Sequence, residues 1–451
     1  MGTTMKKMGM RRALLRSGVG FAAALTVGLV FDLPTAHAQV SVFKSMEKSD
    51  SDMARWLSGI TLTGQIEGGI MANPARPQPG YNFGDFFADH ANQVQLNQAE
   101  FTLQKAIDPS KGGYQIGFTL EGMYGSDARY YQLLGVSAHE WNARYQLIPA
   151  QAHADVHLPW ATKGGLDMHA GILQAPMGVE TLDPTTRPFY TIAYTSEYSV
   201  PFQHIGAMFN WHVTDMVDVT FGIDTGNQTS FGRSDNNNAP AGYFGFNLNG
   251  LAHGKLNIIE LSRVGPENSR YSSAGGRYEA DHAERFWNDI NATYAVNDRL
   301  TLTGEFNYIH DEGLNGIRSN GDFKAADAES FVSFLSYRIN KVLTFNYRGE
   351  IYRDNNNLMV STFIGNNAYM DGISGRSSPG DALMPGPTGH GTTYGEMTLG
   401  VTYKPDLGHH VRVFMLRPEI RFDRSLNDTT PFNGGRNNGM FTFGGDAVIG
   451  F

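Results

Sequence analysis

The last thirteen residues of the chain, Gly439–Phe451, alternate between two kinds of side chain. One face carries Phe, Gly, Ala and Ile residues and ends on Phe451, and the other carries small or polar residues such as Thr442 and Asp446. A period of two predicts a β-strand. An unpaired strand in that position would expose an edge that invites aggregation. A closed barrel removes the edge by pairing the last strand with the first, so we predict a barrel.

This ending resembles the terminal strand of bacterial outer-membrane β-barrels, in which the final Phe belongs to the signal read by the assembly machinery. The resemblance implies that Phe451 is part of an assembly signal and that the barrel-assembly machinery is a partner. Closure also suits a membrane, because every backbone polar group must find a partner within the protein there. The alternative is a sheet edge in a secreted β-protein.

The first residues predict a targeting segment. Basic residues between Lys6 and Arg16 precede an apolar stretch, 18–31, and Ala36–Ala38 fits a cleavage site for small residues. The apolar stretch is shorter than the roughly 20 residues that a membrane-spanning helix needs. We therefore expect a signal peptide over 1–38, a short periplasmic segment over 39–57 and a transmembrane barrel over 58–451.

The expected mature chain is acidic. The predicted signal peptide holds five of the 35 Lys/Arg residues and one of the 44 Asp/Glu residues, which leaves 30 basic and 43 acidic residues and a formal net charge of −13. This charge argues against nucleic acid as a partner. The chain is 41% hydrophobic, and no long apolar run follows residue 38, which argues against an α-helical membrane protein. There is no Cys, so neither a disulfide nor a lipid-modified N-terminal Cys can form.

The alternation recurs along the chain and predicts sixteen strands. They are 58–70, 92–106, 112–125, 140–158, 165–174, 203–213, 216–225, 241–249, 252–263, 283–296, 299–311, 326–339, 341–354, 391–405, 410–424 and 439–451. Short connections such as 214–215 alternate with long ones such as 355–390, as in outer-membrane barrels with short periplasmic turns and long external loops. We predict an all-β, antiparallel, up-and-down transmembrane barrel with both termini in the periplasm.

The pattern also assigns faces. Apolar positions are expected to point to lipid and polar positions to the lumen. The parity changes between Leu96 and Ala99, which predicts a β-bulge. A barrel of sixteen strands is too wide for side chains to fill, so its polar interior should hold water.

The third long connection, 175–202, carries several Pro and aromatic residues, which predicts an ordered loop. Here the chain resembles the OmpL-like β-barrel porin family, which carries a Gly-x-Glu, an aromatic–Ser stretch and a Pro…His-x-Gly entry to a strand. The matching residues are Gly178, Glu180, Tyr194, Ser196, Pro201, His204 and Gly206. The resemblance in architecture covers nearly all of the expected mature chain and implies pore formation.

Porins fold their third loop inward to narrow the channel, and the resemblance implies the same for 175–202. The candidate constriction residues are Glu180, Asp183 and Arg187 in the loop, and Arg348, Glu350, Arg417, Glu419 and Arg421 on the facing wall. The alternative is a loop that caps the outside of the barrel with its charges in solvent.

Histidine and aspartate residues recur on neighbouring strands. If the strands around the turn near residue 162 pair symmetrically, Asp155 lies opposite His169 and His157 opposite Asp167, with His153 nearby. Such a cluster could bind a divalent metal. Cross-strand polar pairing in a wet lumen is the interpretation we favour, since a metal site needs converging ligands, and we predict no metal and no cofactor.

The leading hypothesis is an outer-membrane porin of a Gram-negative bacterium that lets small hydrophilic solutes and ions diffuse passively. A solute-specific channel, for instance for sugars, is the first alternative. A barrel enzyme is less favoured, because the Gly-x-Ser-x-Gly, His-Glu-x-x-His and P-loop signatures are absent from the sequence. An adhesin or receptor that acts through its long loops is also less favoured, and the sequence does not reject it. Outer-membrane lipid is an expected partner, and the oligomeric state is left open.

Overall fold

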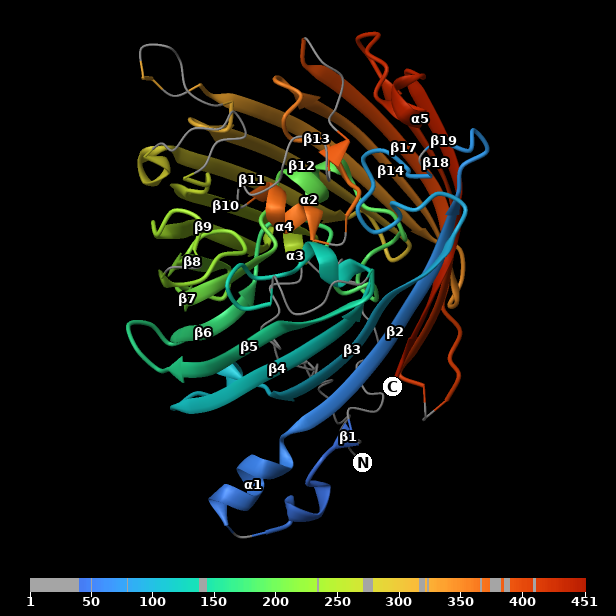
Figure 1. Cartoon of the computed structure of the whole chain (residues 1–451). Coiled ribbons are helices and arrows are strands. Elements are labelled where there is room, and N and C mark those ends of the chain that lie inside the picture. The colour runs from blue at the N-terminus through green and yellow to red at the C-terminus, as the bar shows by residue number, and fades with distance from the viewer. Residues whose placement is uncertain are drawn as a thin grey trace, which may run out of the picture.

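The computed structural model describes residues 40–49, 51–78, 80–137, 144–232, 235–270, 279–315, 321–322, 324–365, 367–373, 383–384, 390–408 and 411–451. Sixteen long antiparallel strands form its wall (Figure 1). They are β2 (Thr61–Ala72), β3 (Val94–Lys105), β4 (Gln115–Gly125), β5 (Gln146–Leu158), β6 (Leu166–Gln174), β7 (Gln203–His212), β8 (Val217–Asp224), β9 (Ala241–Gly250), β10 (Leu256–Pro266), β11 (Glu284–Ala295), β12 (Leu300–Asp311), β13 (Ala326–Arg338), β14 (Leu343–Asp354), β17 (Thr392–Tyr403), β18 (Val413–Ser425) and β19 (Gly439–Gly450). The predicted fold class is confirmed.

The wall closes between the last strand and the first. β19 pairs with β2 from Phe443 opposite Ala72 to Gly450 opposite Gln65. Phe451 continues the ladder, because its N–H donates to Gly64 O at 2.9 Å and its carbonyl accepts from Gly64 N at 3.0 Å. A Cβ on Gly64 would lie 2.6 Å from the Phe451 ring. Glycine therefore leaves the space in which the terminal aromatic ring lies.

Sixteen strands were predicted and the boundaries agree within a few residues, with two informative differences. β10 begins at Leu256, because residues 251–254 (α3, Leu251–Gly254) form a tight turn with Ala252 at φ 49° and His253 at φ 62°. β2 begins at Thr61, because α1 (Asp52–Ser58) occupies the positions before it. The predicted start of the 140–158 strand lies partly outside the described residues.

The segment before the barrel lies at the end of the wall where both marked termini are found (Figure 1). It contains β1 (Val40–Ser41), the 3-10 turn η1 (Lys44–Met46) and α1. β1 adds to the edge of β2 opposite Thr61–Leu62. Trp56 of α1 donates to Ile116 O at 2.9 Å, which fixes the helix against β4. In the described part of the chain, no helix is long and apolar enough to cross a membrane.

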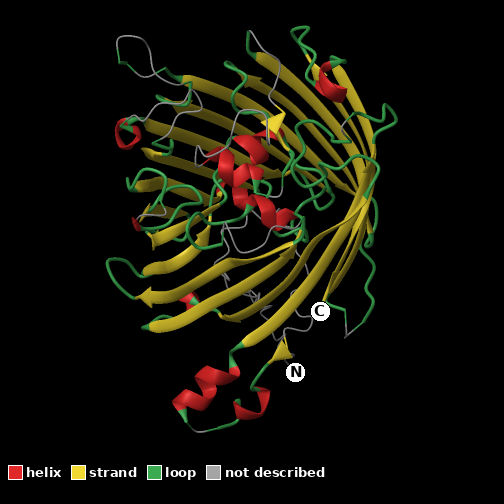
Figure 2. Cartoon of the chain, in the orientation of Figure 1, coloured by secondary structure: helices red, strands yellow, loops and turns green. Residues whose placement is uncertain are grey.

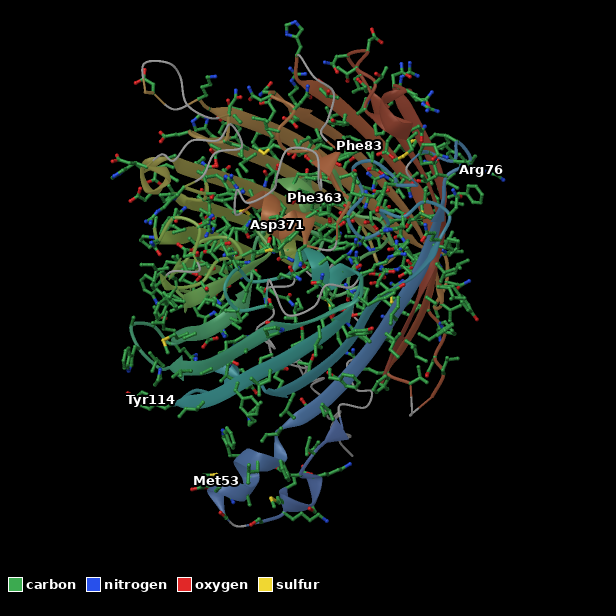
Figure 3. All side chains as sticks on the ribbon, in the orientation of Figure 1. Met53, Arg76, Phe83, Tyr114, Phe363 and Asp371 are labelled. Carbon is green, nitrogen blue, oxygen red and sulfur yellow. The ribbon has the colours of Figure 1, made fainter. Side chains whose placement is uncertain are left out.

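The two faces of the wall separate by polarity, as predicted. Large apolar side chains such as Phe101, Ile116 and Phe331 are more than half exposed on the outer surface, whereas polar residues such as Glu305 and Asn307 are fully buried inside. Figure 3 shows the exposed Tyr114 on the outside of the wall. The predicted bulge is present, since Glu67 pairs with Gln98 and Gly68 with Leu96, which leaves Asn97 as the extra residue.

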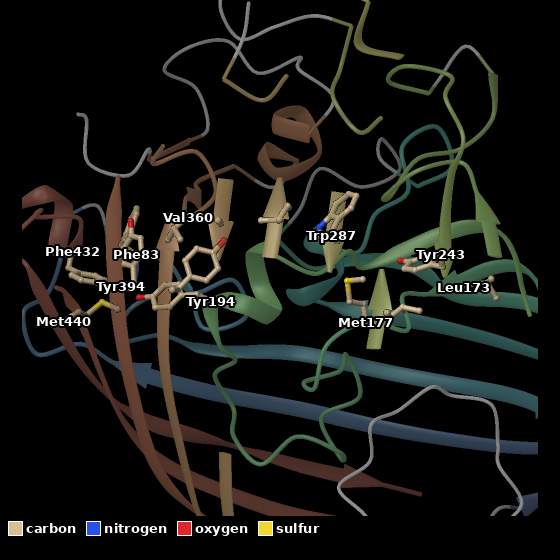
Figure 4. Packing of buried hydrophobic residues seen from close by; sticks show 14 of the residues in the cluster. Phe83, Leu173, Met177, Tyr194, Tyr243, Trp287, Val360, Tyr394, Phe432 and Met440 are labelled. Carbon is tan, nitrogen blue, oxygen red and sulfur yellow. The ribbon is translucent and has the colours of Figure 1, made fainter. Parts of the chain in front are cut away.

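Several long connections fold into the barrel instead of leaving it. Helices α2 (Tyr194–Tyr198) and α4 (Ala368–Ile373) lie within the ring of strands (Figure 2). The short strands β15 (Thr362–Phe363) and β16 (Leu383–Met384) belong to the same connection as α4, between β14 and β17, and α5 (Phe432–Gly435) lies between β18 and β19. The 3-10 turn η2 (Pro109–Lys111) precedes β4, η3 (Asp127–Tyr130) follows it, and η5 (Ala280–His282) precedes β11. Inside the wall, Tyr194 of α2 packs with Phe83, Val360 and Tyr394 (Figure 4). The barrel therefore has an apolar core at the level of its inward-folded loops.

Candidate functional site

The connection 175–202 between β6 and β7 lies inside the barrel. Most of its side chains are buried, with Tyr190, Ala193 and Tyr194 fully so. Its contacts reach strands far away along the wall, among them β2, β14 and β18. Of the two placements that the sequence left open, an inward fold and an external cap, the structure has the inward fold.

Arg348 of β14 lies beneath the loop and donates six hydrogen bonds to the loop and the wall. Its Nη1 donates to Glu180 Oε1 at 2.8 Å and to the carbonyl oxygen of Thr191 at 2.7 Å. Its Nε and Nη2 each lie 3.2 Å from a carboxylate oxygen of Glu396, and Nη2 also donates to Thr398 Oγ1 at 3.2 Å. The guanidinium is fully buried and bridges the loop to β14 and β17.

Arg417 of β18 attaches the next part of the loop. Its Nη1 donates to the carbonyl oxygens of Pro184 and Arg187 at 2.7 and 2.8 Å. Its other nitrogens bind the Asp446 carboxylate of β19 and, at 3.0 Å, Glu67 of β2. A planar guanidinium can satisfy several acceptors in fixed directions, which suits arginine to this position.

Arg421 of β18 joins two loops. Its Nη1 donates to Ile192 O at 2.8 Å and lies 2.9 Å from Asp85 in the connection after β2. It also pairs with Asp423 at 3.0 Å and lies 5.2 Å from the centre of the Tyr194 ring. Burial raises the pKa of Asp85 to about 7, although Arg421 opposes the shift.

Wall carboxylates hold the backbone of the loop. Glu350 accepts hydrogen bonds from the two N–H groups of residues 194–195, each at 2.7 Å. Glu419 accepts from the N–H groups of residues 190–191 at 2.8 and 3.2 Å. These bonds supply acceptors for loop N–H groups that have left water, which buried backbone requires.

The two charged candidates in the middle of the loop have different surroundings. Arg187 is buried, lies 3.2 Å from Glu67 and places its guanidinium 5.6 Å from the Phe87 ring centre. Asp183 is half-buried and accepts from Gln65 Nε2 at 3.1 Å and from its own turn. Of the eight constriction candidates, the three wall arginines and both wall glutamates lie under the loop. Their constriction role stays a prediction.

The family-motif residues of the loop fix its conformation. Gly178 has φ 90°, and a Cβ there would lie 3.1 Å from Val200. The Glu180 carboxylate accepts from the backbone N–H of Ala193 at 2.7 Å and from Ser196 Oγ at 3.3 Å. Glu180 of the Gly-x-Glu motif thus joins the two ends of the loop through the aromatic–Ser stretch. The same carboxylate attaches the loop to Arg348 of the wall.

The Pro…His-x-Gly entry fixes the start of β7. His204 lies 2.5 Å from the Tyr243 hydroxyl through Nε2 and 3.2 Å from Gly226 O through Nδ1. A Cβ on Gly206 would approach Ile223 O to 2.3 Å. His204 therefore ties β7 to β9 and to the connection after β8, and Gly206 lets β8 approach.

A cavity of about 80 Å³ remains between the loop and strands β5, β6 and β7. Polar residues from the wall and the loop face it together with Pro201 of the motif: Gln151, His153, His169, Gln174, Glu180 and Asn210. Among the eight constriction candidates, Glu180 is the one that lines this cavity. The wall side of the cavity is thus mostly polar, with Leu173 and Met208 as its apolar residues.

The predicted His–Asp pairs occur in the register of β5 and β6. Asp155 lies opposite His169 and His157 opposite Asp167. The atoms are in contact, with His169 Nδ1 2.6 Å from Asp155 Oδ1 and His157 Nδ1 2.5 Å from Asp167 Oδ1. Symmetric pairing about the turn was therefore the correct interpretation, and whether these residues bind a metal is a separate question.

Sequence reasoning missed the carboxylates that balance the wall arginines. They are Glu67, Asp85, Glu396, Asp423 and Asp446. Four of them, all except Asp85, lie on predicted strands at lumenal positions, so alternation alone offered a signal. Their ion pairs with the arginines depend on how the strands are staggered and on the inward fold of the loop 175–202. Neither can be predicted from local sequence.

Aromatic residues from other connections cover the loop. Phe86 stacks on Tyr130 with ring centres 4.5 Å apart, and Tyr131 stacks on Phe202 at 4.8 Å. Tyr369 of α4 contacts Phe86 at 5.6 Å. Four long connections therefore meet inside one half of the barrel.

Solved structures with a similar fold are bacterial outer-membrane proteins. The outer membrane channel DcaP of Acinetobacter baumannii matches with a TM-score of 0.51 and 10% identity over 87% of this chain and 97% of that chain. The anion-selective porin from Comamonas acidovorans matches with 0.51 and 12% identity over 87% and 99%. OprB of Pseudomonas putida matches with 0.50 and 12% identity over 87% and 94%. At such identities the likeness shows the fold.

No curated protein matched the sequence. The model of one protein family, described as "Putative beta-barrel porin-2, OmpL-like", matches residues 59–451, which contain all sixteen wall strands and the loop motif. The chain belongs to this OmpL-like β-barrel porin family.

Proposed function

We propose that the protein is a passive channel of the Gram-negative outer membrane for small hydrophilic solutes and ions. The observation that carries the proposal is the loop 175–202, attached by buried ion pairs inside a closed wall whose inner face is polar. A fixed obstacle in a water-filled tube limits solute size without any chemical step. Residues 1–38 would be removed on export, and the end that carries the short turns and both termini would face the periplasm.

Each candidate charge acts in one of two ways in this proposal. Arg348, Arg417 and Arg421 hold the loop, and their charges are balanced by buried carboxylates. Glu180 is one of those carboxylates, because its side chain is fully buried against Arg348. Asp183 is half-buried in the loop and sets the ion preference. Because the arginines are paired with carboxylates, they contribute little to the electrostatic field at Asp183. We therefore infer that the channel weakly prefers cations.

A solute-specific channel is the second candidate. Tyr131 and Phe202, which stack on each other, line the cavity together with Gln151, Gln174 and Asn210. An apolar face with a few placed polar groups is the composition of small-ligand sites.

Planar-bilayer recording tests the channel. The folded protein should give discrete, ohmic conductance steps, and boiled protein should give none. Liposome swelling should then slow smoothly with increasing sugar size for a diffusion channel, whereas block that saturates with one sugar supports the second candidate. Folded protein that never conducts contradicts both.

A further inference from the structure

Three lumenal side chains converge on one point of the wall. His153 and Asp155 lie on β5 and His169 on β6, and all three are buried. The Nδ1 atoms of His153 and His169 lie 2.7 and 2.6 Å from the same oxygen, Asp155 Oδ1. One ligand atom from each residue lies within 4.8 Å of the other two. Ligands around a single metal ion require such a spacing.

The neighbouring histidine group is built differently. Asp167 uses one oxygen for His157 and its other oxygen for His212, at 2.5 and 3.1 Å. His212 then turns its Nδ1 to Asp218 at 2.7 Å. These side chains form a chain of pairs along the wall, and their donor atoms spread apart instead of meeting.

A second observation points to a ligand at the convergent group. Within the part of the chain that the structure describes, the buried Nε2 atom of His169 has no hydrogen-bond partner. Buried polar atoms are normally paired, so this nitrogen, on the other side of the ring from the Nδ1 that contacts Asp155, is a second position at which His169 could hold an ion. His153, His169 and Gln151 line the cavity beneath the loop, so a solvent ion can approach.

The surroundings favour a cation. Gln151 connects the group to a further carboxylate, because its Nε2 donates to Glu121 Oε2 at 3.2 Å while its Oε1 lies 3.2 Å from His153 Nε2. Glu180 of the loop lines the same cavity. Carboxylates around metal-binding histidines orient the rings and increase their basicity.

We propose that His153, Asp155 and His169 bind one divalent ion of the borderline transition-metal class, for which Zn²⁺ is the probe. Two imidazoles and one carboxylate suit zinc, copper or nickel better than magnesium or calcium. Ligand distances of about 2.0–2.2 Å require the present nitrogen–oxygen contacts to widen by less than about 1 Å. Three protein ligands leave a further coordination position open to the cavity. Metal binding at this site is a property separate from the proposed channel function, and it does not require that the protein conducts.

Calorimetric titration of the folded, chelator-stripped protein with ZnCl₂ tests the proposal. Wild type should bind one Zn²⁺ per chain, and His153→Ala/His169→Ala should bind at least about tenfold more weakly. Two controls should match wild type. His157→Ala/His212→Ala breaks the neighbouring group, and His310→Ala removes a histidine on another strand that pairs with Asp327.

Two results overturn the proposal: no saturable binding to wild type, or binding to His153→Ala/His169→Ala with wild-type affinity. Should the double variant lose its barrel, as shown by loss of heat-modifiable migration, X-ray absorption at the zinc edge of the wild-type complex decides. Two imidazole nitrogens with oxygen ligands support the site, and an all-oxygen shell overturns it.

Discussion

Replacing Arg348 by Met is expected to destabilise the attachment of the loop more than any exposed substitution. The change removes six hydrogen bonds and leaves the buried Glu180 carboxylate without its cation. Glu396 keeps the weaker ion-pair contact with Arg421, at 4.0 Å. Breaking a buried ion pair by removing one partner costs about 3–5 kcal/mol. The destabilisation cannot exceed the free energy with which the loop binds to the wall. Beyond that value the loop detaches, and Glu180 returns to water.

Two measurements distinguish a destabilised barrel from a detached loop. Urea unfolding in lipid vesicles reports the free energy of unfolding, and limited proteolysis within 175–202 reports release of the loop. Arg353→Met is the matched control on the same strand, because Arg353 donates to Asn355, Gly391 and Thr393, which are neutral acceptors. If Arg348→Met unfolds within about 0.5 kcal/mol of the control and its loop is equally protected, the buried pairs do not hold the loop.

Further predictions concern closure, pH and selectivity. Gly64→Val should displace the Phe451 ring and lower the yield of heat-modifiable barrel, as should Phe451→Asp. Gly122→Val on β4, where a Cβ meets nothing within 4 Å and φ is not positive, should reduce that yield less. Because burial raises the pKa of Asp85 above its unfolded value, the folded state binds more protons, and stability should fall as pH rises from about 4 to about 7. Asp85→Asn should flatten that part of the unfolding curve, and an unchanged slope would remove Asp85 from the explanation. Asp183→Asn should shift reversal potentials toward anions, and the shift should shrink between 0.1 and 1 M salt as the screening length falls from about 10 to about 3 Å. A salt-independent shift would mean that Asp183 acts through loop conformation.

Most of the fold could be predicted from the alternation of apolar and polar residues in the sequence. A lumenal residue on a strand is recognisable because its neighbours point to lipid, so strand number, faces and the bulge at Asn97 were predictable. Turn symmetry likewise predicted the pairs Asp155–His169 and His157–Asp167.

The site could be predicted only in part, because its contacts join residues far apart in the chain. Glu180 and Arg348 are separated by 168 positions, and no local pattern relates them. Whether 175–202 turns inward depends on the sum of such contacts across the barrel. The partner carboxylates Glu396 and Asp446 were missed for the same reason.

Single-channel recording of a variant that lacks residues 179–199 and keeps Pro201–Gly206 tests the role of the loop most directly. With the loop gone, the wall alone limits flow, so each channel should open to a larger conductance than wild type at the same salt concentration. A variant that folds as a heat-modifiable barrel and conducts no more than wild type would contradict a constriction at 175–202.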